Sequence, residues 1–306
     1  MTHYQLVSEN KTKSWLIIIG FVAFIATASY LIATGLGYGL DVVGMTLIFS
    51  GIGSFASYFW ADKIILGISG ARPASREEFF DFYTVTENLC LGQKMPVPKL
   101  YVIEDSAMNA FATGRDPEHA VVCATTGLLS RLNRAEIEGV VAHELSHIKN
   151  YDILLMSVVS VLVGSVALLA DWLLRMSHWG GGRRRDDRGS GDGQIQAILF
   201  VVALLLAFLS PIIAQLIQLA ISRNREFLAD ATGAGISKNP EGLAKALEKI
   251  SADREPLEAA NKATAHLYIA NPLKNLRGGV SNFAKFFMTH PPVEERIAAL
   301  RGIARK

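Results

Sequence analysis

The sequence predicts an α-helical integral membrane protein with about four transmembrane helices, which carries a mainly α, α+β soluble domain. The main reason is the distribution of hydrophobic residues, which make up 50% of the 306-residue chain. Four apolar runs have no charged residue in their interior, and each reaches or approaches the roughly 20 residues that a helix needs to cross a bilayer core. These runs cover residues 14–33, 42–60, 153–170 and 195–221. The remaining segments show the periodicity of soluble helices and strands.

The charges beside these runs predict their orientation. Lys11 and Lys13 precede the first run and Lys63 follows the second, which places both ends of a first hairpin in the cytoplasm. A retained anchor is favoured over a signal peptide, because the first run is long for an h-region and a second run follows it closely. We expect a transmembrane hairpin, a second hairpin inserted later, and a cytoplasmic domain in two segments. These parts are residues 1–66, residues 153–221, and residues 67–152 with 222–306, respectively.

The loop at residues 177–193, between the last two apolar runs, leaves one question open. It carries four arginines and three aspartates. A full crossing by both helices would put the arginines on the outer side, against the positive-inside tendency. The two helices therefore either span the bilayer or dip into it. In both cases the chain returns to the side that it left.

The soluble segments predict a small sheet among helices. Ser75 and Glu78 indicate a capped helix at residues 75–91, and β-like runs follow at residues 100–103, 109–113 and 120–124. We expect these runs to form a small antiparallel β-meander, whose exposed edge can accept an extended peptide as a further strand. Later helices are predicted after Asn133, after Asn239 and at residues 289–300.

The helix predicted after Asn133 carries the pattern His-Glu-x-x-His. Asn133 and Glu136 form a capping-box signal, and apolar residues follow at helical spacing. Residues four apart share one helix face, so His143 and His147 can each offer an imidazole nitrogen to one metal ion. Glu144 lies at the rim of that face, where it can reach a metal-bound water without being a ligand. The pattern therefore predicts a catalytic zinc site with Glu144 as general base.

Two histidines leave such a site incomplete, because an open zinc site needs a third protein ligand. Glu226 is the candidate. Asp230, one helical turn later, can accept a hydrogen bond from the outer nitrogen of a ligand, which we expect to be His143. The alternative is that both acids are solvated helix charges paired with Arg223 and Arg225. Topology favours the ligand, because a hairpin of membrane helices returns Glu226 to the face that the metal-binding helix occupies.

Composition excludes other kinds of site. The net charge of +2 gives no nucleic-acid footprint. Cys90 and Cys123 are too few and too dispersed for a disulfide framework or a thiolate metal site, which suits a reducing compartment. A closed structural zinc site in a non-catalytic membrane scaffold stays open as an alternative, with Asp152 or His290 as its fourth ligand.

Four motifs, in this order along the chain, resemble the HtpX family of bacterial heat-shock membrane zinc metalloproteases, which is related to the CAAX prenyl proteases. The motifs are residues 109–114, 143–152, 225–230 and 290–296. The resemblance implies that His143, His147 and Glu226 are zinc ligands and that Glu144 is the catalytic base. It also implies a gluzincin-type fold in which Asp230 supports a ligand.

The same resemblance implies an activity. We expect an endopeptidase in the bacterial inner membrane, with its catalytic domain facing the cytoplasm and one zinc ion per chain. It would hydrolyse misfolded or damaged membrane proteins in cooperation with the ATP-dependent protease FtsH. Asn109 and His290 are candidate oxyanion donors or contacts to the substrate backbone. Processing of a defined lipidated or signal-like peptide is the alternative activity.

Overall fold

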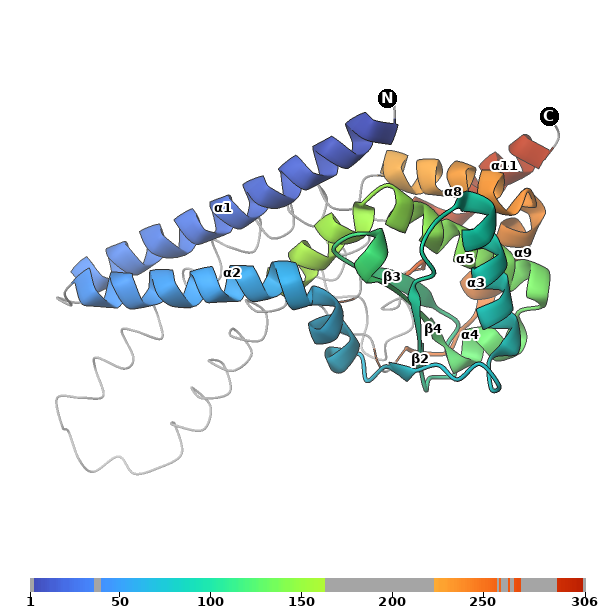
Figure 1. Ribbon diagram of the computed structural model, residues 1–306, viewed down its shortest axis with the longest axis horizontal. Coiled ribbons are helices and arrows are strands. Elements are labelled where there is room, and N and C mark those ends of the chain that lie inside the picture. The colour runs from blue at the N-terminus through green and yellow to red at the C-terminus, as the bar shows by residue number, and fades with distance from the viewer. Residues whose placement is uncertain are drawn as a thin grey trace.

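The computed structural model describes residues 3–35, 40–162, 223–257, 259, 264, 267–270 and 291–304. Four predicted features lie outside these residues: the fourth apolar run, the end of the third from residue 163 on, the loop at residues 177–193, and His290. A long helical hairpin extends from a body in which helices surround a small sheet (Figure 1).

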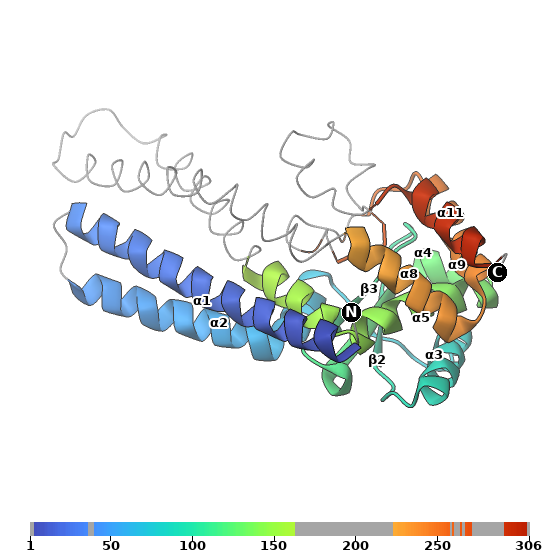
Figure 2. The same ribbon diagram turned by 90° about the horizontal axis from the view of Figure 1, so that it is seen from above.

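The hairpin consists of α1 (His3–Gly35) and α2 (Leu40–Ile68), which run side by side in both views (Figures 1 and 2). The first two predicted apolar runs lie within these helices. Val43–Ile68 is, among the described residues, the one helix long and apolar enough to cross a membrane. The hairpin exposes many large apolar side chains, a pattern that marks a membrane or protein contact. They include Trp15, Leu16, Ile19, Met45, Ile48, Phe49, Ile52 and Phe55.

The third predicted run begins in the helix Asp152–Leu162, which follows the metal-binding helix almost directly. One face of this helix packs against α1. Ile17 and Ile18 of α1 form a buried apolar cluster with Leu154, Leu155 and Val158. The hairpin is thus attached to the body at the point where the metal-binding helix ends.

The sheet has four strands in the order β1-β2-β4-β3, with β2 and β4 parallel and the other pairs antiparallel. The strands are β1 (Arg72–Pro73), β2 (Lys99–Ile103), β3 (Ala110–Gly114) and β4 (Ala120–Thr125). The predicted strand positions agree with β2, β3 and β4, but the predicted antiparallel meander is wrong. β4 lies between β2 and β3, so only β3 and β4 form a hairpin.

The loop after β2 explains this order. Ala107 N donates to Asp105 Oδ1 (2.9 Å), and Thr125 Oγ1, at the end of β4, donates to Ala107 O (2.6 Å). These bonds hold the loop across the end of β4. The chain therefore passes the position beside β2, which β4 occupies, and enters the sheet at its outer edge as β3. Strand periodicity indicates that a strand exists but says nothing of its neighbours, so the sequence pattern could not predict the crossover.

The predicted exposed edge is also different in the structure. All residues of β3 are buried. Ile269 N donates to Ala110 O (2.9 Å), so another part of the chain already pairs with the start of this outer strand. An added peptide therefore meets an edge that is partly occupied.

Both faces of the sheet are covered. One face packs on α5 (Arg134–Lys149), and α3 (Phe80–Gln93) and α9 (Pro240–Ala252) pack on α5 within the same apolar core. The other face contacts the last turns of α2 through Ala61, Ile65 and Leu66. The sheet thus fixes the base of the hairpin relative to α5.

The helix predicted at residues 75–91 begins later than expected, at Phe80. Glu78 N does bind Ser75 Oγ (3.1 Å), but the Glu78 carboxylate pairs with Arg72 and does not return to the backbone of Ser75. The reciprocal half of the capping box is therefore replaced by an ion pair.

Helix α5 is the centre of the body, and its predicted capping box is confirmed. Asn133 Oδ1 accepts from Glu136 N (3.0 Å), and Asn133 N donates to Glu136 Oε2 (2.9 Å). Helices α3, α9 and α8 (Arg223–Ser237) pack against it (Figure 2). The remaining helices are α4 (Thr126–Arg131), α11 (Val293–Ala304) and a 3₁₀ turn, Pro117–His119.

Two glycines let helices approach α5 closely. A Cβ on Gly139 would lie 2.4 Å from Leu243 N of α9, and a Cβ on Gly233 of α8 would lie 3.0 Å from His143 Cα. Side chains at these positions would push the backbones apart. The second contact brings the first turn of α8, with Glu226, over the His-Glu-x-x-His pattern.

Candidate active site

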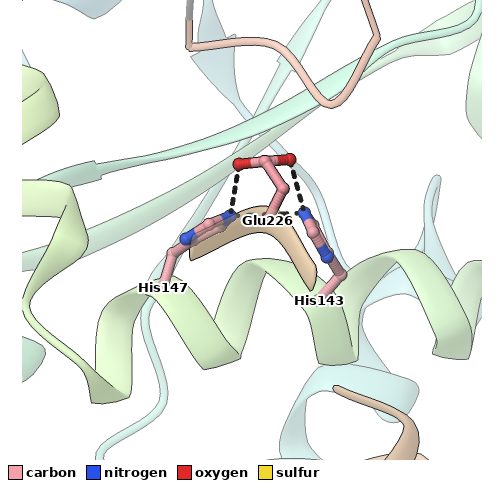
Figure 3. A group of neighbouring side chains, drawn as sticks. All are labelled: His143, His147 and Glu226. Carbon is pink, nitrogen blue, oxygen red and sulfur yellow. Dashed lines mark hydrogen bonds and ion pairs between the residues drawn. The ribbon is translucent and has the colours of Figure 1, made fainter. Parts of the chain in front are cut away.

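The three predicted metal ligands come together in the interior of the body (Figure 3). His143 and His147 point from one face of α5 toward the carboxylate of Glu226, a residue of α8. The two Nε2 atoms are 3.2 Å apart. Glu226 Oε1 lies 3.6 Å from Nε2 of His147, and Oε2 lies 3.9 Å from Nε2 of His143. All three side chains are buried.

The outer nitrogens of both imidazoles contact carboxylates. His143 Nδ1 is 3.0 Å from Asp230 Oδ1, and His147 Nδ1 is 3.0 Å from Asp152 Oδ2. A carboxylate at Nδ1 favours a proton there and leaves the Nε2 lone pair directed inward. Asp230 thus lies at the outer nitrogen of His143, and Asp152 lies at the outer nitrogen of His147.

This donor set fits zinc. Two ligand atoms at the usual distance from a tetrahedral zinc are about 3.3 Å apart, close to the separations found here. The acids also favour positive charge between the imidazoles: burial lowers the pKa of His147, but Asp152 and Glu226 outweigh burial and raise it to about 9. A zinc ion held by these residues would supply that positive charge in place of the imidazole proton.

Glu144 lies on α5 beside the first histidine and is only 2% exposed. Burial raises the pKa of this carboxyl to about 7, and the charge of Glu226 adds to the effect. A backbone hydrogen bond with Ala112 of β3 acts in the opposite direction. A carboxyl group with a pKa near neutrality can both accept and return a proton, which general acid–base chemistry needs.

A buried arginine, the last residue of the motif at residues 290–296, completes the charges of the site, a role that the sequence analysis did not assign to it. Arg296 of α11 is 1% exposed and holds Asp230 with two bonds, from Nε to Oδ2 (2.8 Å) and from Nη2 to Oδ1 (2.7 Å). Its Nη1 donates to Ile269 O (3.1 Å) and lies 3.5 Å from Glu226 Oε2. Arg296 therefore neutralises the acids that surround the imidazoles.

This pairing decides the charge of Asp230. Burial alone would raise the pKa of Asp230, but the charge and hydrogen bonds of Arg296, together with His143, lower it to about 2. The signal in the sequence is weak: an arginine three residues after Val293 and four before Leu300 lies on the apolar face of the last helix. A lone charge on such a face needs a buried partner.

The remaining predicted residues have mixed outcomes. Reading Glu226 and Asp230 as solvated charges is wrong, because each is 2% exposed. Asn109 is buried, and its amide binds the Ala270 backbone, donating from Nδ2 to O (3.0 Å) and accepting at Oδ1 from N (3.3 Å). Asp152 contacts the outer nitrogen of His147, not the metal-facing one.

Comparisons with known proteins agree with this site. Residues 82–304 match the profile of peptidase family M48. The chain is 43% identical over 304 residues to a protease HtpX homolog from Thermoanaerobacter pseudethanolicus, covering 99% of this chain and 98% of that protein. A protease HtpX homolog from Dictyoglomus thermophilum is 43% identical over 308 residues, with coverages of 100% and 96%.

A solved structure shows the same fold. The crystal structure of Ste24p from S. mikatae has a TM-score of 0.50 and 18% identity, and the match covers 97% of this chain and 67% of that one. At this identity the similarity concerns the fold alone. The match to the family profile and the identity to the HtpX proteins decide the assignment: the chain belongs to peptidase family M48, as a zinc metalloprotease related to HtpX over nearly its whole length.

Proposed function

We propose that this protein is a zinc-dependent endopeptidase of the bacterial inner membrane that hydrolyses misfolded or damaged membrane proteins. The observation that carries the proposal is the buried convergence of His143, His147 and Glu226, with Glu144 next to them on α5. This is the donor set of a catalytic zinc site, which keeps one coordination position open.

In the proposed mechanism the three converging residues hold one zinc ion per chain, as in a gluzincin-type protease. Zinc, when bound, acts as a Lewis acid toward water and the scissile carbonyl. Glu144 takes the proton from the attacking water and passes it to the leaving amine. Asp230 and Asp152 keep the imidazoles oriented through their outer nitrogens. Asn109 and His290 remain proposed contacts to the substrate backbone or the oxyanion.

The membrane setting is part of the proposal. The exposed apolar surface of the α1–α2 hairpin supports a membrane anchor at residues 1–66. Because α5 continues almost directly into the apolar helix Asp152–Leu162, the site would lie close to the bilayer. We propose four membrane helices, a second hairpin at residues 153–221, and a cytoplasmic catalytic domain from residues 67–152 and 222–306. Such a site can reach the cytoplasmic loops of membrane proteins, and the relation to HtpX favours cooperation with FtsH.

Substrate class can be tested with one membrane protein in two states. The purified full-length enzyme in detergent, loaded with zinc, is incubated with a folded membrane protein and with a destabilised variant of that protein. We expect cleavage of the destabilised form at several sites and little cleavage of the folded form. Neither form should be cleaved after a chelator removes the zinc.

A prenylated peptide with one defined scissile bond serves as the comparison substrate. Efficient cleavage of this peptide, with both membrane proteins left intact, would favour the peptide-processing activity and contradict the proposed role. Equal cleavage of folded and destabilised protein would contradict selection for misfolded chains.

A further inference from the structure

Asn10 is a buried polar residue inside α1, far from the metal ligands in sequence. It is 2% exposed, although asparagine is a weak helix former that has no local reason to lie in a helix interior. A buried amide is costly unless its donors and its acceptor are bonded. Its partners therefore indicate why α1 carries it.

These partners lie 140 to 215 residues away in the sequence. Asn10 Nδ2 donates to Asp152 Oδ1 (2.8 Å) and to Asn150 O (2.9 Å). Its Oδ1 accepts from Arg225 Nη2 (3.0 Å). One amide thus binds both the segment that follows α5 and the first turn of α8.

Asp152 is where these bonds meet the metal site. Its Oδ1 is shared between Asn10 Nδ2 and Arg225 Nε (3.1 Å), while its Oδ2 contacts Nδ1 of His147 (3.0 Å). With one oxygen held by two donors, the other has a fixed direction toward the imidazole. Arg225 also directly precedes Glu226, so the same contacts fix the start of the helix that carries the third ligand.

We propose that Asn10 is a positioning residue for the zinc site: it fixes Asp152 and Arg225, and through them the orientation of His147. This inference rests on the proposed zinc site and adds to it a dependence on the N-terminal helix. The site is then held not by the catalytic domain alone but also by α1, which packs against the helix Asp152–Leu162 through Ile17 and Ile18.

The expected effect is moderate. Mutating a residue that hydrogen-bonds to a metal ligand typically lowers metal affinity or activity about 10- to 100-fold. Because Asn10 acts through Asp152, we expect Asn10→Leu to weaken zinc binding about tenfold. Asn10→Asp keeps the size of the side chain but removes both donors and places a second carboxylate against Asp152. Its zinc affinity should therefore fall at least as much.

The test uses the full-length protein in detergent and has two readouts besides cleavage. Zinc affinity is measured by competition with a chelating dye, and the ligand geometry by the visible spectrum of the cobalt-substituted protein. We expect weaker zinc binding and a shifted cobalt spectrum in both Asn10 variants. The control is Lys13→Ala, on the same helix at a residue paired with Glu9. It should leave the zinc affinity and the cobalt spectrum unchanged. Thermal unfolding of the metal-free proteins checks that each variant is folded.

A double-mutant cycle with Asp152→Asn separates positioning from general stability. If Asn10 acts through Asp152, then Asn10→Leu adds much less than tenfold once Asp152 is replaced. Unchanged zinc affinity in both Asn10 variants, or a full tenfold effect in the Asp152→Asn background, would overturn the inference. If the unaltered protein binds zinc as described but cleaves nothing, the proposed protease fails while the positioning role stands.

Discussion

Replacing Glu226 by glutamine should release the zinc ion and abolish cleavage with it. Glutamine keeps the shape of the side chain but removes the negative charge of the third zinc ligand, beside the two imidazoles. Mutating a residue that only supports a ligand typically lowers metal affinity about 10- to 100-fold. Removing the ligand itself should therefore lower zinc affinity more than about 100-fold. Zinc per chain after dialysis, measured by atomic absorption, and cleavage of an unfolded substrate should fall together.

The control is Glu241→Gln, at a residue of α9 that pairs with Arg301 on the surface. It should retain zinc and activity. If Glu226→Gln kept about one zinc per chain and cleaved normally, the third ligand would have to be another residue.

Replacing Arg296 by leucine should have the largest effect on folding. Asp230 and Glu226 would remain buried without their cationic partner. Breaking a buried ion pair on one side typically costs about 3–5 kcal/mol, because an uncompensated charge stays in the interior. We expect a clear drop in the temperature of thermal unfolding in detergent, in the zinc-loaded as well as the metal-free protein.

Arg301→Leu is the matched control, since Arg301 lies on the same helix and pairs with Glu241 and Glu248 at the surface. Exposed pairs contribute little to stability, so this variant should unfold near the temperature of the unaltered protein. Equal unfolding temperatures for Arg296→Leu and the unaltered protein would show that Arg296 does not compensate the acids.

The part of the site that lies on one helix could be predicted from the sequence. His143, Glu144 and His147 are within five residues, and helical geometry alone fixes their relative directions. Glu226 required one further argument, that a membrane hairpin returns the chain to its starting side. Asp230 followed because it lies one turn after Glu226.

The parts that depend on distant contacts could not be predicted. Asn10 and Arg296 reach the site from opposite ends of the chain, and no spacing rule connects either of them to α5. The predicted strand order is wrong for the same reason, because the hydrogen bonds of Asp105 and Thr125 in the loop after β2 decide the crossover. Patterns in the sequence report periodicity within an element, whereas these contacts depend on packing between elements.

The most direct test of the account compares the unaltered protein with Glu144→Ala, both purified in detergent without chelators. Zinc content and cleavage of an unfolded substrate are measured on the same samples. We expect about one zinc per chain in both proteins and cleavage by the unaltered protein alone, with a loss of at least about 100-fold in the variant. Cleavage by Glu144→Ala at the rate of the unaltered protein would contradict the assignment of Glu144 as the general base.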